Sequence, residues 1–247
     1  MGLVDSHCHL DRYERPLEVL QRAEAKRVVT VAVTELPSHF QRLALRLGSR
    51  RLVRPALGIH PLRAATVSPM ELALFTELLD QTEYVGEVGL DKSHEGRGSF
   101  RAQVKVFEHL LQQPRIKRKV LTVHSRGAEA ETIERLAVVD VTAILHWYSG
   151  PLKHIDAAAA AGLWFSVNPA MLRSKNGQRT LATLPRERVV TETDGPYTKA
   201  SGRSSEPSDI PAVIAGLARI WGEPPDDARA RVCANMTAIA AAARLAQ

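Results

Sequence analysis

The chain has 247 residues, a length that suits one large α/β domain or two small ones. Hydrophobic residues make up 45% of the sequence and charged residues 24%, a globular balance that excludes a disordered chain. The net charge of +6 favours acidic partners such as nucleic acid, although many basic proteins bind none.

Cysteine content and polarity limit the cellular setting. Only two cysteines, Cys8 and Cys233, are present, which argues against a secreted disulfide scaffold. Asp5, His7 and Asp11 interrupt the N-terminal region where a signal peptide would be apolar, and no apolar run approaches the roughly 20 residues of a membrane span. We therefore expect a cytoplasmic protein that does not insert into membranes.

Short apolar runs alternate with longer stretches of helical spacing along most of the chain. The runs that predict strands are residues 3–7, 28–33, 52–58, 84–90, 120–124, 141–146, 163–167 and 189–192. Helices are predicted between them at 16–25, 37–47, 69–79, 100–111, 128–136 and 152–161. Units of about 25–30 residues are typical of a (β/α)8 barrel or a large doubly wound sheet.

The remaining segments indicate one domain and disfavour dinucleotide binding. No G-x-G-x-x-G sequence follows the first predicted strand. Polar loops are expected at 91–99 and 198–208, followed by C-terminal helices at 209–221 and 226–245. Because no long linker divides the chain, we expect a single domain over residues 1–247.

Polar side chains stand where the predicted strands end. Alternate residues of a strand share a face, so His7 and His9 can chelate one metal ion. Glu87 is charged within an otherwise apolar run, and a buried carboxylate is costly unless it is paired or bound to metal. Further polar residues at strand ends are His60, His124, His146 and Asp194.

In a barrel these strand ends gather on one face. Imidazole nitrogens with carboxylate oxygens suit Zn or Mn, whereas oxygen-rich sites suit Mg. Glu87 could bridge two ions, and such a pair activates a water and stabilises both oxygens of an in-line phosphoryl transfer. The residues therefore predict a hydrolase with two divalent metal ions, which are Mg, Mn or Zn.

Six blocks in this order resemble the motif series of TatD-family deoxyribonucleases. They are residues 5–11, 58–61, 86–91, 124–126, 146–150 and 191–197. The resemblance implies a TIM-barrel metallohydrolase of the amidohydrolase-like group. It implies one metal held by His7, His9, Glu87 and Asp194, and a second held by Glu87, His124 and His146.

The resemblance also implies roles around the metals. Asp194 would orient or deprotonate the attacking water beside Glu87, while His60 and Arg126 would face substrate phosphate. Trp147 and Tyr148 could stack on bases, although core packing explains them equally well. Basic residues in loops that follow the strands would ring the mouth of the site: Arg12, Arg15, Arg63, Arg126, Arg173, Lys175, Lys199 and Arg203.

A narrower resemblance concerns residues 146–150, 164–172 and 191–197, which are similar to the QatD branch, the TatD-like nuclease of Qat anti-phage defence systems. It implies a defence role and other Qat-system proteins as partners. The sequence departs from typical family members at Lys92-Ser93, at Trp147-Tyr148 and at 198–201. No implied ligand is lost, but the rim of the site differs, so substrate preference does not carry over.

The expected reaction is hydrolysis of DNA phosphodiester bonds, with exonuclease action on single strands or DNA ends. Two other functions remain open. The first is another metallohydrolase, such as an amidohydrolase or an aminoacyl-tRNA deacylase, because the same site suits attack on a carbonyl. The second is a catalytically silent binding subunit of a defence complex, which the full set of implied ligands disfavours.

Overall fold

The computed structural model describes residues 2–245. Within them, parallel strands follow one another in sequence order around a single eight-stranded sheet. The strands are β1 (Leu3–Cys8), β2 (Val28–Ala32), β3 (Val53–Leu57), β4 (Tyr84–Gly89), β5 (Val120–His124), β6 (Thr142–Leu145), β7 (Trp164–Val167) and β8 (Val189–Thr191). The predicted (β/α)8 TIM barrel is therefore confirmed.

The first and last strands lie side by side and close the barrel. The hydroxyl of Thr191 donates to the carbonyl of Val4 at 2.7 Å. Beyond the end of β8, the amide of Asp194 donates to the carbonyl of His7 at 2.9 Å, and the amide of His9 donates to the carbonyl of Gly195 at 2.8 Å. These bonds fix the two chain segments that carry the N-terminal histidines and Asp194.

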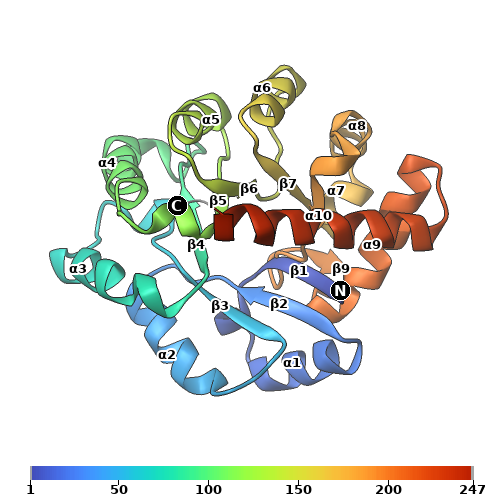
Figure 1. Ribbon diagram of the computed structural model, residues 1–247, viewed down its shortest axis with the longest axis horizontal. Coiled ribbons are helices and arrows are strands. Elements are labelled where there is room, and N and C mark those ends of the chain that lie inside the picture. The colour runs from blue at the N-terminus through green and yellow to red at the C-terminus, as the bar shows by residue number, and fades with distance from the viewer. Residues whose placement is uncertain (1, 246–247) are drawn as a thin grey trace.

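Helices surround the strands (Figure 1). They are α1 (Pro16–Ala25), α2 (Pro37–Leu47), α3 (Pro69–Leu78), α4 (Phe100–Leu111), α5 (Glu129–Ala137), α6 (Ile155–Ala160), α7 (Pro169–Arg173), α8 (Lys175–Thr183), α9 (Ile210–Trp221) and α10 (Pro225–Leu245). Buried phenylalanines fill the layer between helices and strands, among them Phe75, Phe107 and Phe165. Each such side chain contributes about 1.5–3 kcal/mol by leaving water.

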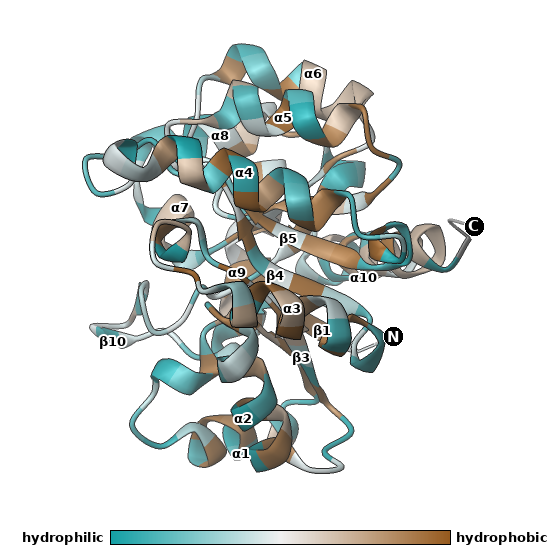
Figure 2. Cartoon of the chain, turned by 90° about the vertical axis from the view of Figure 1, so that its left-hand side faces the viewer, coloured by the Kyte–Doolittle hydropathy of each residue, from teal (hydrophilic) through white to brown (hydrophobic). Residues whose placement is uncertain are grey.

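Helix α10 covers the N-terminal end of the barrel, where the strands begin. Met236, Ile239 and Ala243 of α10 form a buried cluster with residues near the starts of the strands, including Val4 and Val190. Figure 1 shows α10 running across the strands at this end, and Figure 2 places α10 and β10 (Arg203–Ser204) on opposite sides of the barrel. The opposite, C-terminal end is left for a binding site.

Two segments hold more regular structure than the sequence predicts. Helices α7 and α8 follow β7, where no helix was expected, because Asn168 and Ser174 cap their first turns through side-chain oxygens. The polar segment 198–208 contains a hairpin of β9 (Lys199–Ala200) and β10, whose turn places Ser201 and Gly202 at positive φ. Capping and turn residues carry this structure with little apolar periodicity to reveal it.

Among residues 2–245, no helix combines the length and the apolar character that crossing a bilayer requires.

We expect Asn235→Ala to destabilise the fold by about 1–3 kcal/mol, because it removes two hydrogen bonds that join α10 to backbone carbonyls near the start of β8. The buried Asn235 amide donates to the carbonyl of Arg186 at 2.8 Å and to that of Val189 at 2.7 Å. Urea unfolding followed by circular dichroism measures the change. The exposed Arg229→Ala on the same helix is the control and should shift stability by less than about 0.5 kcal/mol. Equal stability of the two variants would contradict this role of Asn235.

Candidate metal centre

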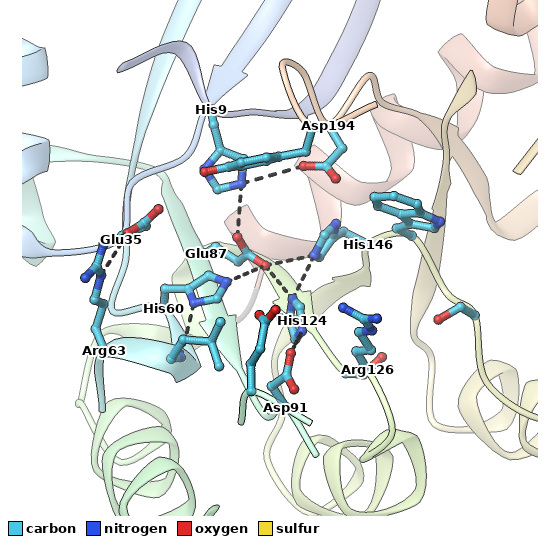
Figure 3. Close-up of a pocket in the computed structure, with 16 residues that line it drawn as sticks. His9, Glu35, His60, Arg63, Glu87, Asp91, His124, Arg126, His146 and Asp194 are labelled. Carbon is cyan, nitrogen blue, oxygen red and sulfur yellow. Dashed lines mark hydrogen bonds and ion pairs between the residues drawn. The ribbon is translucent and has the colours of Figure 1, made fainter. Parts of the chain in front are cut away.

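A cavity of about 740 Å³ opens at the C-terminal end of the barrel. Figure 3 shows Glu87 near its middle, with His9, His60, His124 and His146 pointing toward it. These side chains come from strands or from the residues that directly follow them. The predicted convergence of the strand ends is therefore present in the structure.

The first group of candidate ligand atoms comes from β1 and the residue after it, from β4, and from the segment after β8. The Nε2 atoms of His7 and His9 lie 3.2 Å apart. Glu87 Oε2 is 3.6 Å from the His7 nitrogen and 3.1 Å from that of His9. Asp194 Oδ1 is 3.7 Å and 3.6 Å from the same two nitrogens.

These separations fit a metal ion in the middle of the group. Ligand atoms at about 2.1 Å from a tetrahedral zinc lie about 3.4 Å from one another. The five distances, 3.1–3.7 Å, bracket this value. Asp194 Oδ1 is buried and receives no hydrogen bond within the described part of the chain, as expected for an oxygen that faces a cation.

The second group uses the other oxygen of Glu87. Its Oε1 lies 2.7 Å from His124 Nδ1 and 2.9 Å from His146 Nε2. The two imidazole nitrogens are 3.4 Å apart. Each oxygen of Glu87 thus faces its own set of nitrogen atoms, which is the arrangement of a carboxylate that bridges two sites.

The far nitrogen atoms of two of these histidines, His7 and His124, have hydrogen-bond partners that orient the rings. His7 Nδ1 is 2.6 Å from the hydroxyl of Thr122, and His124 Nε2 is 2.7 Å from Asp91 Oδ2. His146 Nδ1 faces Glu192 at 3.8 Å, which is longer than a hydrogen bond. Partners of this kind set the tautomer and raise the basicity of a metal-ligating histidine.

Asp91 and Glu192 were not singled out as functional residues from the sequence. Glu192 is fully buried and accepts hydrogen bonds from the Asn168 amide at 2.9 Å, the Trp147 backbone at 3.1 Å and the Ser166 hydroxyl. Its charge in the eighth predicted strand was a usable signal, as Glu87 was in the fourth. Asp91 lay within a motif block, but its contact across to β5 is visible only in the fold.

Asp5, also on β1, connects the strand that carries His7 to the segment that carries Asp194. It is fully buried and accepts from the Thr193 amide at 2.9 Å, from the Thr193 hydroxyl at 2.5 Å and from the His7 amide at 3.2 Å. Burial outweighs these bonds and raises the pKa of Asp5 to about 8. Asp5 therefore ties the backbone of His7 to that of the residue before Asp194.

Burial and neighbouring charges separate the protonation of the carboxylates. Burial would raise the pKa of Glu87, but the imidazoles of His60 and His146 and hydrogen bonds from His124 hold it well below its usual range. Burial raises the pKa of Asp194; the imidazoles of His146 and His9 oppose this shift, and the neighbouring carboxylates add to it. Glu87 thus stays an anion, while Asp194 holds a proton more readily.

His60 is oriented toward the same centre with a defined tautomer. Its Nδ1 accepts a hydrogen bond from the Leu62 amide at 3.1 Å, so in the neutral ring Nε2 carries the hydrogen. Nε2 lies 3.4 Å from Glu87 Oε1, and the side chain is partly open to the cavity. An N–H in this position suits contact with an anion such as phosphate and fits the predicted substrate role better than metal ligation.

The other predicted substrate contacts differ in position. Arg126 is exposed and Trp147 half-buried, and both line the cavity. Tyr148 is 1% exposed, its hydroxyl donates to the Pro151 carbonyl at 2.7 Å, and its ring packs edge-on against Phe165. Of the two roles that the sequence leaves open for Tyr148, this burial fits core packing and not stacking on bases.

Asp194 has an unusual backbone. Its φ of 47° lies in the left-handed region, which few residues other than glycine adopt and which recurs at functional sites. Its carbonyl accepts from the amides of Tyr197 at 2.9 Å and Thr198 at 3.2 Å. This turn places the Asp194 carboxylate beside His7 of β1 and His9, which directly follows it.

The comparisons with known proteins agree with this centre. The family described as TatD related DNase matches residues 4–240. Deoxyribonuclease TATDN3 of Homo sapiens is 32% identical over 243 residues, covering 90% of this chain and 88% of the relative. The metal-dependent hydrolase MJ1582 of Methanocaldococcus jannaschii is 27% identical over 225 residues, covering 88% of each chain.

Solved structures share the architecture. The crystal structure of YJJV, a TatD homologue from Escherichia coli, superposes with a TM-score of 0.86 at 23% identity, covering 96% of this chain and 97% of that one. At this identity the likeness shows the fold alone. Fold, candidate ligands and relatives together define a metal-dependent hydrolase that acts on ester bonds. The chain belongs to the TatD-related DNase family.

We expect Asp91→Asn to weaken Mn²⁺ binding roughly 10- to 100-fold, because the neutral amide no longer orients His124 or raises its basicity. Isothermal titration calorimetry on metal-stripped protein measures this change. The exposed Asp140→Asn is the matched control and should bind as the wild type does. Unchanged affinity in Asp91→Asn would show that the contact with His124 has no part in metal binding.

Proposed function

We propose that this chain is a deoxyribonuclease that hydrolyses DNA phosphodiester bonds with two divalent metal ions. His7, His9, Glu87 and Asp194 would hold one ion, and Glu87, His124 and His146 the other. The observation that carries the proposal is Glu87, whose two oxygens face two separate sets of imidazole nitrogens at 2.7–3.6 Å. The mixture of nitrogen and oxygen donors suits Zn or Mn and admits Mg.

Bound divalent ions would lower the pKa of a water and offset the charge that develops on the phosphoryl oxygens. The protein's own residues would position the reactants around them. Asp194, whose burial favours the protonated form, would accept the proton of the attacking water. His60 would donate its Nε2 hydrogen to the phosphate, beside Glu87, and Arg126 would bind phosphate at the cavity edge.

The choice of DNA rests on the family and on charge. TATDN3 is named a deoxyribonuclease, and basic side chains that include Arg63 and Arg126 line the mouth. We infer exonuclease action on single strands or DNA ends by analogy with the TatD family. We further propose that residues 1–247 form one domain and that it acts in the cytoplasm, consistent with its unpaired cysteines.

The setting of this activity is a narrower proposal. We propose that the chain belongs to the QatD branch and acts against phages beside other Qat-system proteins. The support is the amino-acid sequence of three segments, 146–150, 164–172 and 191–197. One departure from typical members, Trp147, lines the cavity and is consistent with a substrate or partner particular to that branch.

Hydrolysis of labelled DNA should require metal and both key carboxylates. We expect release of nucleotides with Mg²⁺, Mn²⁺ or Zn²⁺, loss on chelation, and a decrease of at least about 100-fold in Glu87→Gln and Asp194→Asn. Glu187→Gln and Asp140→Asn make the same chemical changes at exposed sites and should retain full activity. Initial rates on single-stranded and duplex oligonucleotides measure the effect.

The same assay separates the other functions. Cleavage that persists in both carboxylate variants would contradict the proposed centre. Hydrolysis of aminoacyl-tRNA or amide substrates without DNA cleavage would favour the rival metallohydrolase, and DNA binding without any hydrolysis would favour a binding subunit.

The defence role predicts a phenotype. Cells that carry the chain with the other proteins of a Qat system should form fewer phage plaques. Asp194→Asn should restore plaque formation, whereas Asp140→Asn should protect as the wild type does. Efficiency of plating measures both, and protection by the Asp194→Asn strain would overturn this role.

A further inference from the structure

One flank of the cavity is charged and aromatic but has no role in the metal centre. It is formed by Tyr197, Arg63, Arg12 and Glu35, which we call the Tyr197 flank. Figure 3 shows Arg63 and Glu35 on one side of Glu87 and Arg126 on the other. Glu35, Arg63 and Tyr197 line the same cavity as the candidate ligands.

Glu35 holds two guanidinium groups in fixed positions. Its Oε2 accepts from Arg63 Nε at 2.9 Å and Nη2 at 2.7 Å, and its Oε1 lies 2.5 Å from Arg12 Nη2. One carboxylate with two cations leaves this group with a net charge of +1. Among residues 2–245, Arg63 Nη1 has no hydrogen-bond partner and retains donors for an anion, and 45% of the Arg63 side chain is exposed.

Tyr197 supplies an open aromatic surface next to this charge. Its ring packs edge-to-face with His9, with centroids 4.9 Å apart and an interplanar angle of 76°. Tyr197 is nevertheless 55% exposed, although it is a large side chain at the mouth of a cavity. The ring is thus held against a candidate metal ligand while more than half of the side chain remains exposed.

The flank is rigidly joined to the centre. The Glu35 carbonyl accepts from the His60 amide at 3.0 Å, and the Tyr197 amide donates to the Asp194 carbonyl at 2.9 Å. A group bound on the flank would therefore be placed directly beside the bond to be broken. An aromatic face next to guanidinium donors matches the two parts of a nucleotide, its base and its phosphate.

We propose that the Tyr197 flank is a nucleotide subsite, in which the base next to the scissile phosphate stacks on Tyr197 and the adjoining phosphate binds Arg63. Arg12 and Glu35 position Arg63. This proposal rests on the proposed function, because it assigns the flank to a DNA substrate. It places one nucleotide on the side of the centre opposite Arg126.

Substrate modification paired with mutation tests the subsite. Binding of fluorescent single-stranded oligonucleotides to Asp194→Asn protein is measured by anisotropy, with an abasic residue placed in turn at each terminal position. Tyr197→Ala in this background should weaken binding roughly 5- to 100-fold, whereas Tyr197→Phe, which keeps the ring, should bind within about twofold. At one position only, the position of the stacked base, the abasic residue should cause no further loss of affinity in the Tyr197→Ala protein.

A neutral methylphosphonate tests the phosphate contact in the same way. Arg63→Gln should weaken binding about fivefold, and this loss should vanish when the methylphosphonate replaces the phosphate adjoining the stacked base. Arg118→Ala, on the exposed surface of the opposite end of the barrel, is the control for general loss of positive charge and should show no such coupling.

The outcomes separate the subsite from the function. One outcome is that the wild type cleaves DNA while the losses of binding free energy from Tyr197→Ala and from the abasic residue add at every position. In that case the subsite is overturned and the nuclease function stands. Coupling to Arg63 without coupling to Tyr197 also overturns it, because the flank would then bind phosphate alone. If the wild type neither binds nor cleaves DNA, the proposed function fails and the subsite with it.

Discussion

The arrangement of side chains at the mouth of the barrel depends on the free energy required to bury the charge of Glu87. A carboxylate that is 2% exposed is tolerated only when cations or hydrogen-bond donors surround it. Here the compensation comes from imidazoles on different strands, of which His7 is oriented by Thr122 and His124 by Asp91. Each β/α unit that supplies a ring must therefore hold its position for Glu87 to stay ionised.

The barrel provides this precision through its closure. Thr191 bonds to β1 across the seam, and Asp5 ties the backbone of His7 to that of Thr193. The seam is thus strongest just below the first group of candidate ligands. Because the two segments that it joins are about 190 positions apart in sequence, the centre exists only once the sheet is complete.

Much of this arrangement follows from the sequence because it depends on periodicity and on charge in apolar runs. Alternating strands and helices predicted the barrel, and Glu87 stood out as a carboxylate within a strand. Side-chain direction within a loop has no such signal, which is why the sequence left core packing and base stacking equally open for Tyr148. Contacts between strands are equally hidden, so the links of Asp91 and Glu192 to the histidines emerged only from the fold.

Helix α10 has a consequence for biosynthesis. It covers the starts of the strands and contacts β1, β5, β6 and β8. Yet every candidate ligand lies before it in the chain, so a ribosome has made the complete site before it makes the helix that seals the other end. During that interval the apolar ends of the strands face solvent, as an exposed surface that chaperones recognise. The 21 residues of α10 therefore complete the apolar cover of the strands only after every candidate ligand has been synthesised.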